Sequence, residues 1–329
     1  MTRRGLPMTP IAVVLLAIAA VASLFLGRVN VAPRAILDGL FSSDVSLAHL
    51  VVMELRLPRT ILAVLVGGAL GLSGAVLQGL LRNPLAEPGL LGVSSGAALG
   101  AVVSIYFSLA TVFSLATPLL GMVGALGAGA LTFALGRGGT LSLILAGSAV
   151  SGLMAAFLAM ALNFAPNPYA AFEMSIWMLG SLSQRSWDHI LLAGPFIVAG
   201  IVVLSTMGRA IDALALGEDQ AASLGINLDR TRVLALLGVG LAAGAATSVT
   251  GSIGFIGLIA PHLVRPFVGY QPSRTMLPSA LFGAALLLLA DIGTRVLHTS
   301  SELRLGVITS LIGTPFFFWL VLRLRKVAP

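Results

Sequence analysis

Apolar runs separated by short polar turns repeat along almost the whole chain. The runs cover residues 11–26, 61–81, 91–107, 118–135, 141–162, 190–207, 233–249, 255–265, 276–297 and 305–322. A helix of about twenty apolar residues crosses the hydrocarbon core of a bilayer. The pattern therefore predicts an all-α polytopic membrane protein with about ten transmembrane helices, built as a single domain over residues 1–329.

Some segments allow more than one interpretation. The first run follows Arg3 and Arg4, so it is either a first membrane span or the apolar core of a cleavable signal peptide. The run at 255–265 is short and contains Pro261, so we expect a broken segment packed inside the bundle. We expect a polar loop at 28–53, and at 172–187 an amphipathic interfacial segment that acts as an aromatic belt or as a gate.

The two halves of the chain resemble each other faintly. A run of small residues with a proline-containing break at 71–88 has a counterpart at 244–266. The two segments would enter the membrane from opposite sides. This arrangement is typical of an inverted repeat.

Composition excludes several classes of protein. Hydrophobic residues make up 57% of the 329 and charged residues only 9%, which is far from a soluble domain. Cysteine is absent, which excludes disulfides and thiolate metal sites. The formal charge of +7 is spread singly along turns and helix ends, so it indicates contact with membrane lipid and no nucleic-acid partner.

The chain has no nucleotide site of its own. Its only lysine is Lys326, whereas a phosphate-binding P-loop needs a lysine after a glycine-rich turn. Any work driven by ATP must therefore be powered by a separate subunit.

The distribution of basic residues predicts the topology. With ten spans and cytoplasmic termini, 12 basic residues lie on the cytoplasmic side and 7 on the outer side. The cytoplasmic residues are Arg3, Arg4, Arg82, Arg137, Arg209, Arg230, Arg232, Arg265, Arg274, Arg323, Arg325 and Lys326. The outer residues are Arg28, Arg34, Arg56, Arg59, Arg185, Arg295 and Arg304. The positive-inside rule favours this orientation. Arg56, Arg59, Arg295 and Arg304 flank outer span ends, which suggests a further purpose for them.

Several long motifs resemble one family. They are RLPR at 56–59, SGAVLQ at 73–78, NPLAEPGLLGVSSGA at 83–97, LALGEDQAASLGI at 214–226, GSIGFIGLIAPHLVR at 251–265, LLLADIGTR at 287–295 and GVITSLIGTPFFFW at 306–319. Together they resemble the FecCD family, the permease subunits of bacterial ABC importers for iron chelates, haem and cobalamin, with a particular likeness to its vitamin B12 permeases. The resemblance implies a functional homodimer in the bacterial inner membrane that works with two ATPase subunits and a periplasmic substrate-binding protein. It implies a transporter subunit without cofactors rather than an enzyme.

Three arginines are candidates for contact with the binding protein. Arg56, Arg59 and Arg295 match family positions that receive acidic residues of that protein, and a solvent-facing guanidinium suits this role. The alternative is a lipid-headgroup anchor. Asp291 stands four residues before Arg295, so we expect a buried ion pair on one helix face, with a proton relay as the alternative.

The polar stretch 209–232 is the main cytoplasmic candidate. Its apolar spacing, broken by two glycines, predicts two very short helices with a turn between them. The family resemblance implies that it inserts into a groove of the ATPase; the alternative is a solvated loop. The candidate coupling residues are Leu214, Ala215, Leu216, Gly217, Glu218, Ala221, Leu224 and Gly225.

Two inward-facing turns are candidates for a cytoplasmic gate, again as the resemblance implies. Their residues are Asn83, Leu85, Thr140 and Ser142. The cargo is harder to predict, because His49, His189, His262 and His298 are scattered and no metal-ligand cluster stands out. We expect an iron–siderophore complex, with haem and cobalamin as alternatives.

Two other classes of protein were weighed against a permease. A stand-alone channel would need no partner. An intramembrane serine protease would use Ser73 with His262 or His298, but neither histidine is predicted at a suitable depth.

Overall fold

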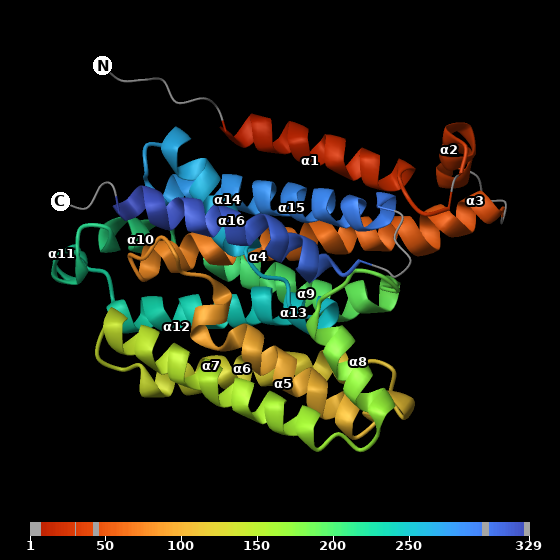
Figure 1. Ribbon diagram of the computed structural model, residues 1–329. Helices are drawn as coiled ribbons and strands as arrows, with labels where there is room; N and C mark the ends of the chain where they lie inside the picture. Colours follow the sequence, from red (N-terminus) through yellow and green to blue (C-terminus); the bar gives the residue numbers. More distant parts are fainter. Residues whose placement is uncertain (1–7, 30, 42–45, 298–302, 326–329) are drawn as a thin grey trace.

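The computed structural model describes residues 8–29, 31–41, 46–297 and 303–325, and none of these forms a strand (Figure 1). The helices are α1 Met8–Phe25, α2 Pro33–Phe41, α3 Leu47–Leu50, α4 Leu57–Leu80, α5 Val93–Tyr106, α6 Ala116–Leu135, α7 Thr140–Asn163, α8 Pro168–Met178, α9 Trp187–Ser205, α10 Gly208–Leu214, α11 Glu218–Ser223, α12 Leu228–Val239, α13 Ala245–Thr250, α14 Ile256–Val264, α15 Pro272–Val296 and α16 Leu305–Arg325. Shorter 3-10 turns cover Pro88–Leu91, Leu109–Thr111 and Arg265–Phe267, and π turns cover Val51–Arg56 and Gly240–Gly244.

Eight helical stretches are long and apolar enough to cross a membrane. They are Met8–Phe25, Leu47–Leu80, Ala116–Leu135, Thr140–Asn163, Trp187–Ser205, Leu228–Thr250, Pro272–Val296 and Leu305–Leu322. Two of the predicted runs form shorter helices, α5 with 14 residues and α14 with 9. The all-α membrane fold is confirmed, while the count of ten crossings and the inverted repeat stay predictions.

Helices α4 and α15 pack against each other in the middle of the bundle. The apolar part of α4 is 83% buried, whereas those of α1 and α16 are 22% buried. Glycines allow the close approach: a Cβ added to Gly67 would lie 2.5 Å from the carbonyl oxygen of Gly283. Backbones in such contact gain packing that lipid cannot replace.

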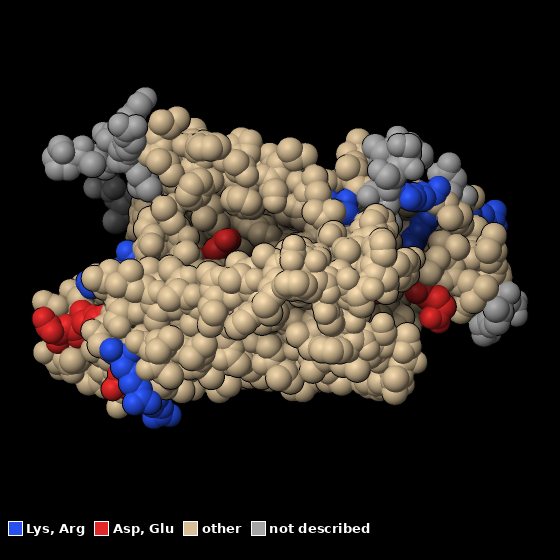
Figure 2. Space-filling view, turned by 60° about the horizontal axis from the view of Figure 1, so that its bottom comes forward, with Lys and Arg blue, Asp and Glu red and all other residues tan. Residues whose placement is uncertain are grey.

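The two ends of the bundle differ from its middle. Charged side chains gather at both ends in Figure 2, and the surface between them is uncharged except for an acidic side chain in a central hollow. This distribution is typical of a protein that crosses a membrane. Helix α1 begins and α16 ends toward the end that carries α10 and α11 (Figure 1).

Two local expectations were wrong. The stretch predicted as a loop contains α2, which starts with Pro33 at its first turn, where a missing N–H costs nothing, and buries Ile36. The stretch 172–187 is not one segment. Helix α8 is followed by Gly180 at a left-handed φ of +68°, and α9 begins only at Trp187.

Candidate functional site

The polar stretch 209–232 forms a segment of two short helices at one end of the molecule, as predicted (Figure 1). We call α10, α11 and the turn between them the coupling segment. The turn depends on Gly217, whose φ of +120° is unfavourable for other residues. Leu214 and Ala221 are buried beneath the segment, whereas Leu216 and Leu224 are 65% and 63% exposed. Of the remaining candidates, Gly217 is buried, Glu218 is partly buried, and Ala215 and Gly225 are exposed.

Glu218 ties the coupling segment to two spanning helices. Its Oε1 accepts hydrogen bonds from the hydroxyl of Thr140 at 2.5 Å and from the Thr140 backbone N–H at 3.3 Å. Its Oε2 accepts from Arg232 Nη2 at 2.8 Å. The Thr140 hydrogen bond is the largest cause that lowers the pKa of Glu218; burial opposes it and Arg232 adds to it. Glu218 is therefore ionised at neutral pH and links the starts of α7 and α12.

Asp212 makes a second link, to α15. Its carboxylate accepts from the Ser273 backbone N–H at 2.8 Å, from the Ser273 hydroxyl at 2.6 Å and from Gln271 Nε2 at 2.8 Å. Burial raises the pKa of Asp212, but these hydrogen bonds and the charge of Arg274 outweigh it, and the net shift is downward. A carboxylate at a helix N-terminus satisfies backbone donors and complements the dipole.

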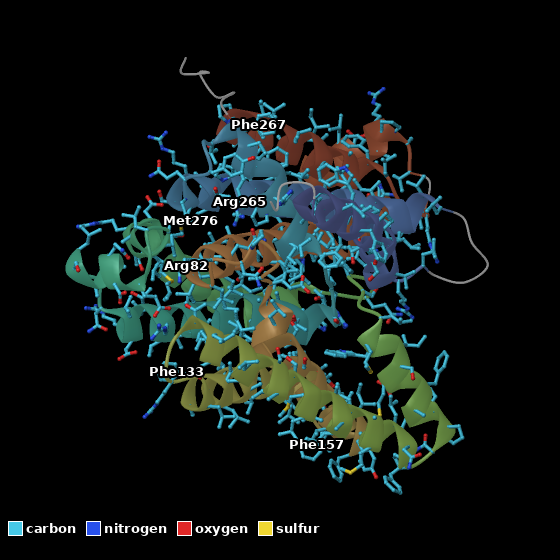
Figure 3. All side chains as sticks on the ribbon, turned by 60° about the vertical axis from the view of Figure 1, so that its left-hand side comes forward. Arg82, Phe133, Phe157, Arg265, Phe267 and Met276 are labelled. Atoms are coloured by element: carbon cyan, nitrogen blue, oxygen red, sulfur yellow. The ribbon has the colours of Figure 1, made fainter. Side chains whose placement is uncertain are left out.

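Both predicted gate turns lie next to the coupling segment. Thr140 contacts Glu218 directly, and Ser142 lies two residues further along α7. In the other turn, Asn83 Oδ1 accepts from the Leu85 N–H at 2.9 Å. Arg82 of this turn points toward the coupling segment (Figure 3), and its Nη1 lies 3.9 Å from the place of a Cβ on Gly217.

The three candidate docking arginines do not all face solvent. Arg56 and Arg295 are each 5% exposed, so the expectation that they present free guanidinium groups is wrong. Arg56 donates to the carbonyls of Leu24, Phe25 and Val29, at 2.7, 3.0 and 2.6 Å. The carbonyls of Leu24 and Phe25 belong to the last turn of α1, which has no further helical turn to satisfy them, and Val29 follows the helix.

Asp291 stands between the other two arginines. It pairs with Arg295 as predicted, at 2.5 Å, and also with Arg59 at 2.7 Å. Arg295 donates further to Ser23, at its carbonyl and its hydroxyl. Asp291 is fully buried and shared by two cations, which suits a structural acid better than a proton relay. A role of these arginines in docking stays a prediction.

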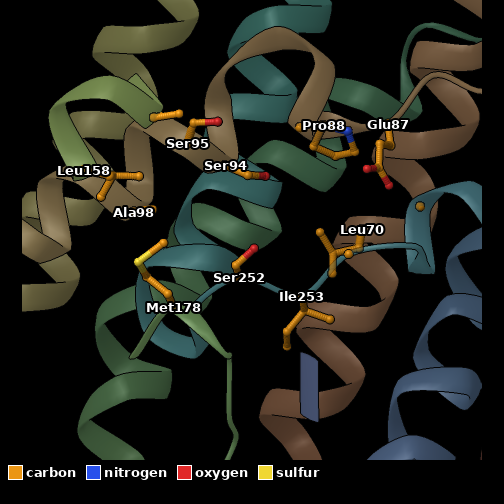
Figure 4. Close-up of a pocket in the computed structure, with 14 residues that line it drawn as sticks. Leu70, Glu87, Pro88, Ser94, Ser95, Ala98, Leu158, Met178, Ser252 and Ile253 are labelled. Atoms are coloured by element: carbon orange, nitrogen blue, oxygen red, sulfur yellow. The ribbon is translucent and has the colours of Figure 1, made fainter. Parts of the chain in front are cut away.

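A hollow opens in the uncharged band of the surface (Figure 2), and Figure 4 shows residues that line it. We call it the polar hollow after the carboxylate and hydroxyl groups in its otherwise mostly apolar wall. A cavity of about 280 Å³ is lined by Glu87, Ser94, Ser95 and Ser252, among others. Glu87 lies beside the backbone N–H of Phe255, which precedes α14. An adjoining cavity of about 700 Å³ shares Ser252 and adds hydroxyl groups of α16, at Ser310 and Thr314.

The hollow was missed in the sequence. Its residues come from α5, the break before it, the 251–255 break and α16, and their spacing along the chain carries no pattern. The one available signal was Glu87, a single acid beside Pro88 in an apolar region. The Ser73 of the protease alternative is fully buried, and its Oγ has no hydrogen-bond partner within the described ranges, so it forms no pair with His262. His298 lies outside the described residues.

Known proteins resemble this chain over nearly its full length. The model of the FecCD transport family matches residues 15–323. The hemin transport system permease protein HmuU of Yersinia pestis is 39% identical over 320 residues, covering 95% of this chain and 94% of the relative. The vitamin B12 import system permease protein BtuC of Vibrio vulnificus is 38% identical over 291 residues, 86% of each chain. A solved structure, described as an inward-facing metal-chelate type ABC transporter, matches with a TM-score of 0.84 and 31% identity, over 96% of this chain and 98% of its own.

Proposed function

The chain belongs to the FecCD transport family and is a multi-pass inner-membrane permease subunit of an ABC importer rather than an enzyme; from this premise, we propose that two copies of it enclose the path of an iron–siderophore complex into the cytoplasm. The importer class covers metal chelates, haem and vitamin B12, and it implies an ATPase and a substrate-binding protein as partners. Cytoplasmic termini, the homodimer and the siderophore cargo are part of the proposal.

The coupling segment is the observation that carries this proposal. It exposes two leucines, Leu216 and Leu224, at an end of the molecule where water surrounds the surface. Exposed apolar side chains on a short segment that is anchored by hydrogen bonds suit insertion into a groove of a partner protein. Glu218 and Asp212 connect the coupling segment to α7, α12 and α15, so closure of an ATPase pair would move these helices as rigid bodies.

The polar hollow supports a homodimer. Glu87 and several hydroxyl groups lie in the uncharged band, where a single copy would expose them to lipid. Polar groups at that depth are costly unless they face water or another chain. A second copy across the hollow would enclose it as a water-filled path. Asn83, Leu85, Thr140 and Ser142 would then narrow its inner mouth.

The proposed cargo is supported by the groups that line the hollow. Within the part of the chain that the structure describes, no three His, Cys, Asp or Glu side chains gather as metal ligands. In this proposal a metal that passes the hollow keeps the ligands of its own chelator. Serine hydroxyls and one carboxylate suit the amide and hydroxyl groups of a siderophore. Haem or cobalamin is the second candidate cargo, and uptake of labelled ferric siderophore, haemin and cyanocobalamin into proteoliposomes distinguishes them.

The proposal is tested at the coupling segment. We expect Leu216→Ser with Leu224→Ser to abolish transport and transport-linked ATP hydrolysis by the co-reconstituted ATPase, while the permease still folds. Leu47→Ser is the matched control, because Leu47 is 74% exposed on α3, toward the other end of the bundle. Full activity of the double variant, or ion conduction or peptide cleavage by the purified chain alone, would overturn the proposal.

A further inference from the structure

A second polar pocket, separate from the hollow, lies at the end of the bundle opposite the coupling segment. Its volume is about 310 Å³, within the range of small-molecule sites. Helices α5, α6, α8 and α9 and the stretch before α16 contribute to its wall. Arg185 and Arg304 both line it, together with His189, Glu173 and Trp177.

The two arginines bring positive charge together in the wall of this pocket. Neither forms an ion pair with a carboxylate within 4.0 Å among residues 8–29, 31–41, 46–297 and 303–325. Burial is the main cause that lowers the pKa of Arg185 to about 10, and the charge of Arg304 contributes. With a pKa of about 10, the Arg185 guanidinium is charged at neutral pH. Two neighbouring cations in a partly desolvated pocket repel each other unless an anion joins them.

Arg185 also lacks good acceptors for its hydrogens. Its Nε is buried and has no hydrogen-bond partner in the described chain. Its Nη1 lies 3.5 Å from His189 Nε2, but His189 Nδ1 already accepts from the Ser186 backbone N–H at 3.3 Å. A neutral imidazole that accepts at Nδ1 carries its hydrogen at Nε2, so Nη1 faces another donor. Arg185 Nε and Nη1 therefore both lack an acceptor among the described residues.

Acidic residues near the pocket leave this charge unbalanced. Glu173 lines the pocket but is exposed on α8, and Asp188 is exposed in the first turn of α9. Exposed carboxylates are screened by water and bind weakly. Neither forms an ion pair with Arg185 or Arg304 within the described residues.

We propose that Arg185 and Arg304 form a binding site for a carboxylate group of the incoming cargo, at the outer mouth of the path. A planar carboxylate matches the guanidinium fork and accepts two hydrogen bonds from it. Trp177 offers an apolar face beside the charge, as an organic chelate needs. That the ligand is a chelate rests on the proposed function. The new element is that the preferred chelates carry carboxylate groups.

Citrate serves as the probe, and its neutral triethyl ester is the control for charge. Isothermal titration of the full-length permease in nonionic detergent should show one citrate bound per chain and no triethyl citrate. Arg185→Gln and Arg304→Gln should each weaken citrate binding about ten-fold or more, since each removes a charge-assisted hydrogen-bond pair. Arg185→Lys should restore part of the affinity, because it keeps the charge but loses the fork. Glu173→Gln should strengthen binding.

Arg34→Gln is the matched control, because Arg34 is exposed on α2 and does not line the pocket. The permease is also titrated in vesicles of phosphatidylcholine, with and without phosphatidylglycerol. Equal citrate affinity in Arg185→Gln, Arg304→Gln and Arg34→Gln would overturn the inference. So would loss of citrate binding when phosphatidylglycerol is present, because the pocket would then hold a lipid phosphate.

The same preparations separate this inference from the proposed function. If Arg185→Gln leaves citrate binding unchanged while the ATPase partner is still stimulated, the anion site is wrong and the importer stands. If the wild-type chain binds citrate through both arginines but supports no ATPase-driven transport, the importer proposal fails and the site remains.

Discussion

Arg59 and Asp291 are 232 positions apart in the chain, and their side chains form a two-pronged ion pair, Nη2 to Oδ1 at 2.7 Å and Nε to Oδ2 at 3.1 Å. Arg295 binds the same carboxylate from the next turn of α15. One buried acid therefore holds the start of α4 against the end of α15. Through Arg295 and Ser23 it also holds the end of α1.

Asp291→Asn should destabilise the permease strongly. The amide keeps the shape but leaves the buried Arg295 and the partly buried Arg59 without a negative charge, and breaking a buried ion pair costs about 3–5 kcal/mol. The unfolding midpoint in detergent measures the effect. Asp38→Asn, at an exposed position on α2, should change the free energy of unfolding by less than about 0.5 kcal/mol. Equal midpoints for the two variants would show that Asp291 is not the central contact.

This cluster shows where sequence reasoning succeeds and where it stops. The pair of Asp291 with Arg295 was predictable because residues four apart share a helix face. The contact with Arg59 was not, because nothing in the local pattern relates positions in α4 and α15. The acceptors of Arg56 are backbone carbonyls of α1, which no side-chain pattern reveals. The arginines were therefore expected at the surface, although two of them are buried.

The helices themselves were easier to predict. Twenty-residue apolar runs can only be helices in a membrane, and Gly217 and Gly225 marked the ends of α10 and α11. The link from Glu218 to Thr140 depends on how α7 and α11 meet, which is a property of the packed bundle. The polar hollow was missed for the same reason.

Gly67→Ala should loosen the contact between α4 and α15. The new Cβ would lie 2.5 Å from the Gly283 carbonyl oxygen and 2.7 Å from the Ala284 Cα, and backbone atoms cannot yield without moving a helix. Overpacking of this kind costs about 1–3 kcal/mol. Gly127→Ala is the matched control in α6, where nothing lies within 4 Å of the new Cβ, so its unfolding midpoint should stay level or rise. A Gly67→Ala protein as stable as wild type would contradict the close packing.

A single cysteine reports whether the polar hollow holds water. The chain has no cysteine, so each introduced thiol is unique. Ser252→Cys and Ser310→Cys, both exposed in the hollow, should react with a charged, membrane-impermeant thiol reagent in proteoliposomes, because water stabilises the reactive thiolate. Val198→Cys, 48% exposed on α9, should stay unlabelled in lipid. If all three cysteines were labelled, or Val198→Cys alone, the hollow would not be the specific water-filled part of the membrane-facing surface, and the proposed path would be wrong.

Glu218→Gln should weaken the link between the coupling segment and α7, and its effect should depend on pH. Glu218 is 26% exposed, so screening reduces its ion pair, and we expect a loss of about 1 kcal/mol at pH 7.5. Because the pKa of Glu218 in the folded protein is lowered, its contribution is present above the usual pKa of a glutamate and is lost as the pH falls through the folded value. Unfolding midpoints of wild type and variant should therefore converge in acid.

Asp229→Asn is the control for Glu218→Gln, because Asp229 is a second carboxylate that pairs with Arg232. Asp229 also pairs with Arg232, at 3.4 Å, but its side chain is 88% exposed, so its removal should leave stability and transport nearly unchanged at every pH. Glu218→Gln should in addition lower transport per ATP hydrolysed, since the gate turn at Thr140 no longer follows the coupling segment. If Asp229→Asn matched Glu218→Gln in both measurements, Arg232 alone would hold the segment and the bond to Thr140 would transmit nothing.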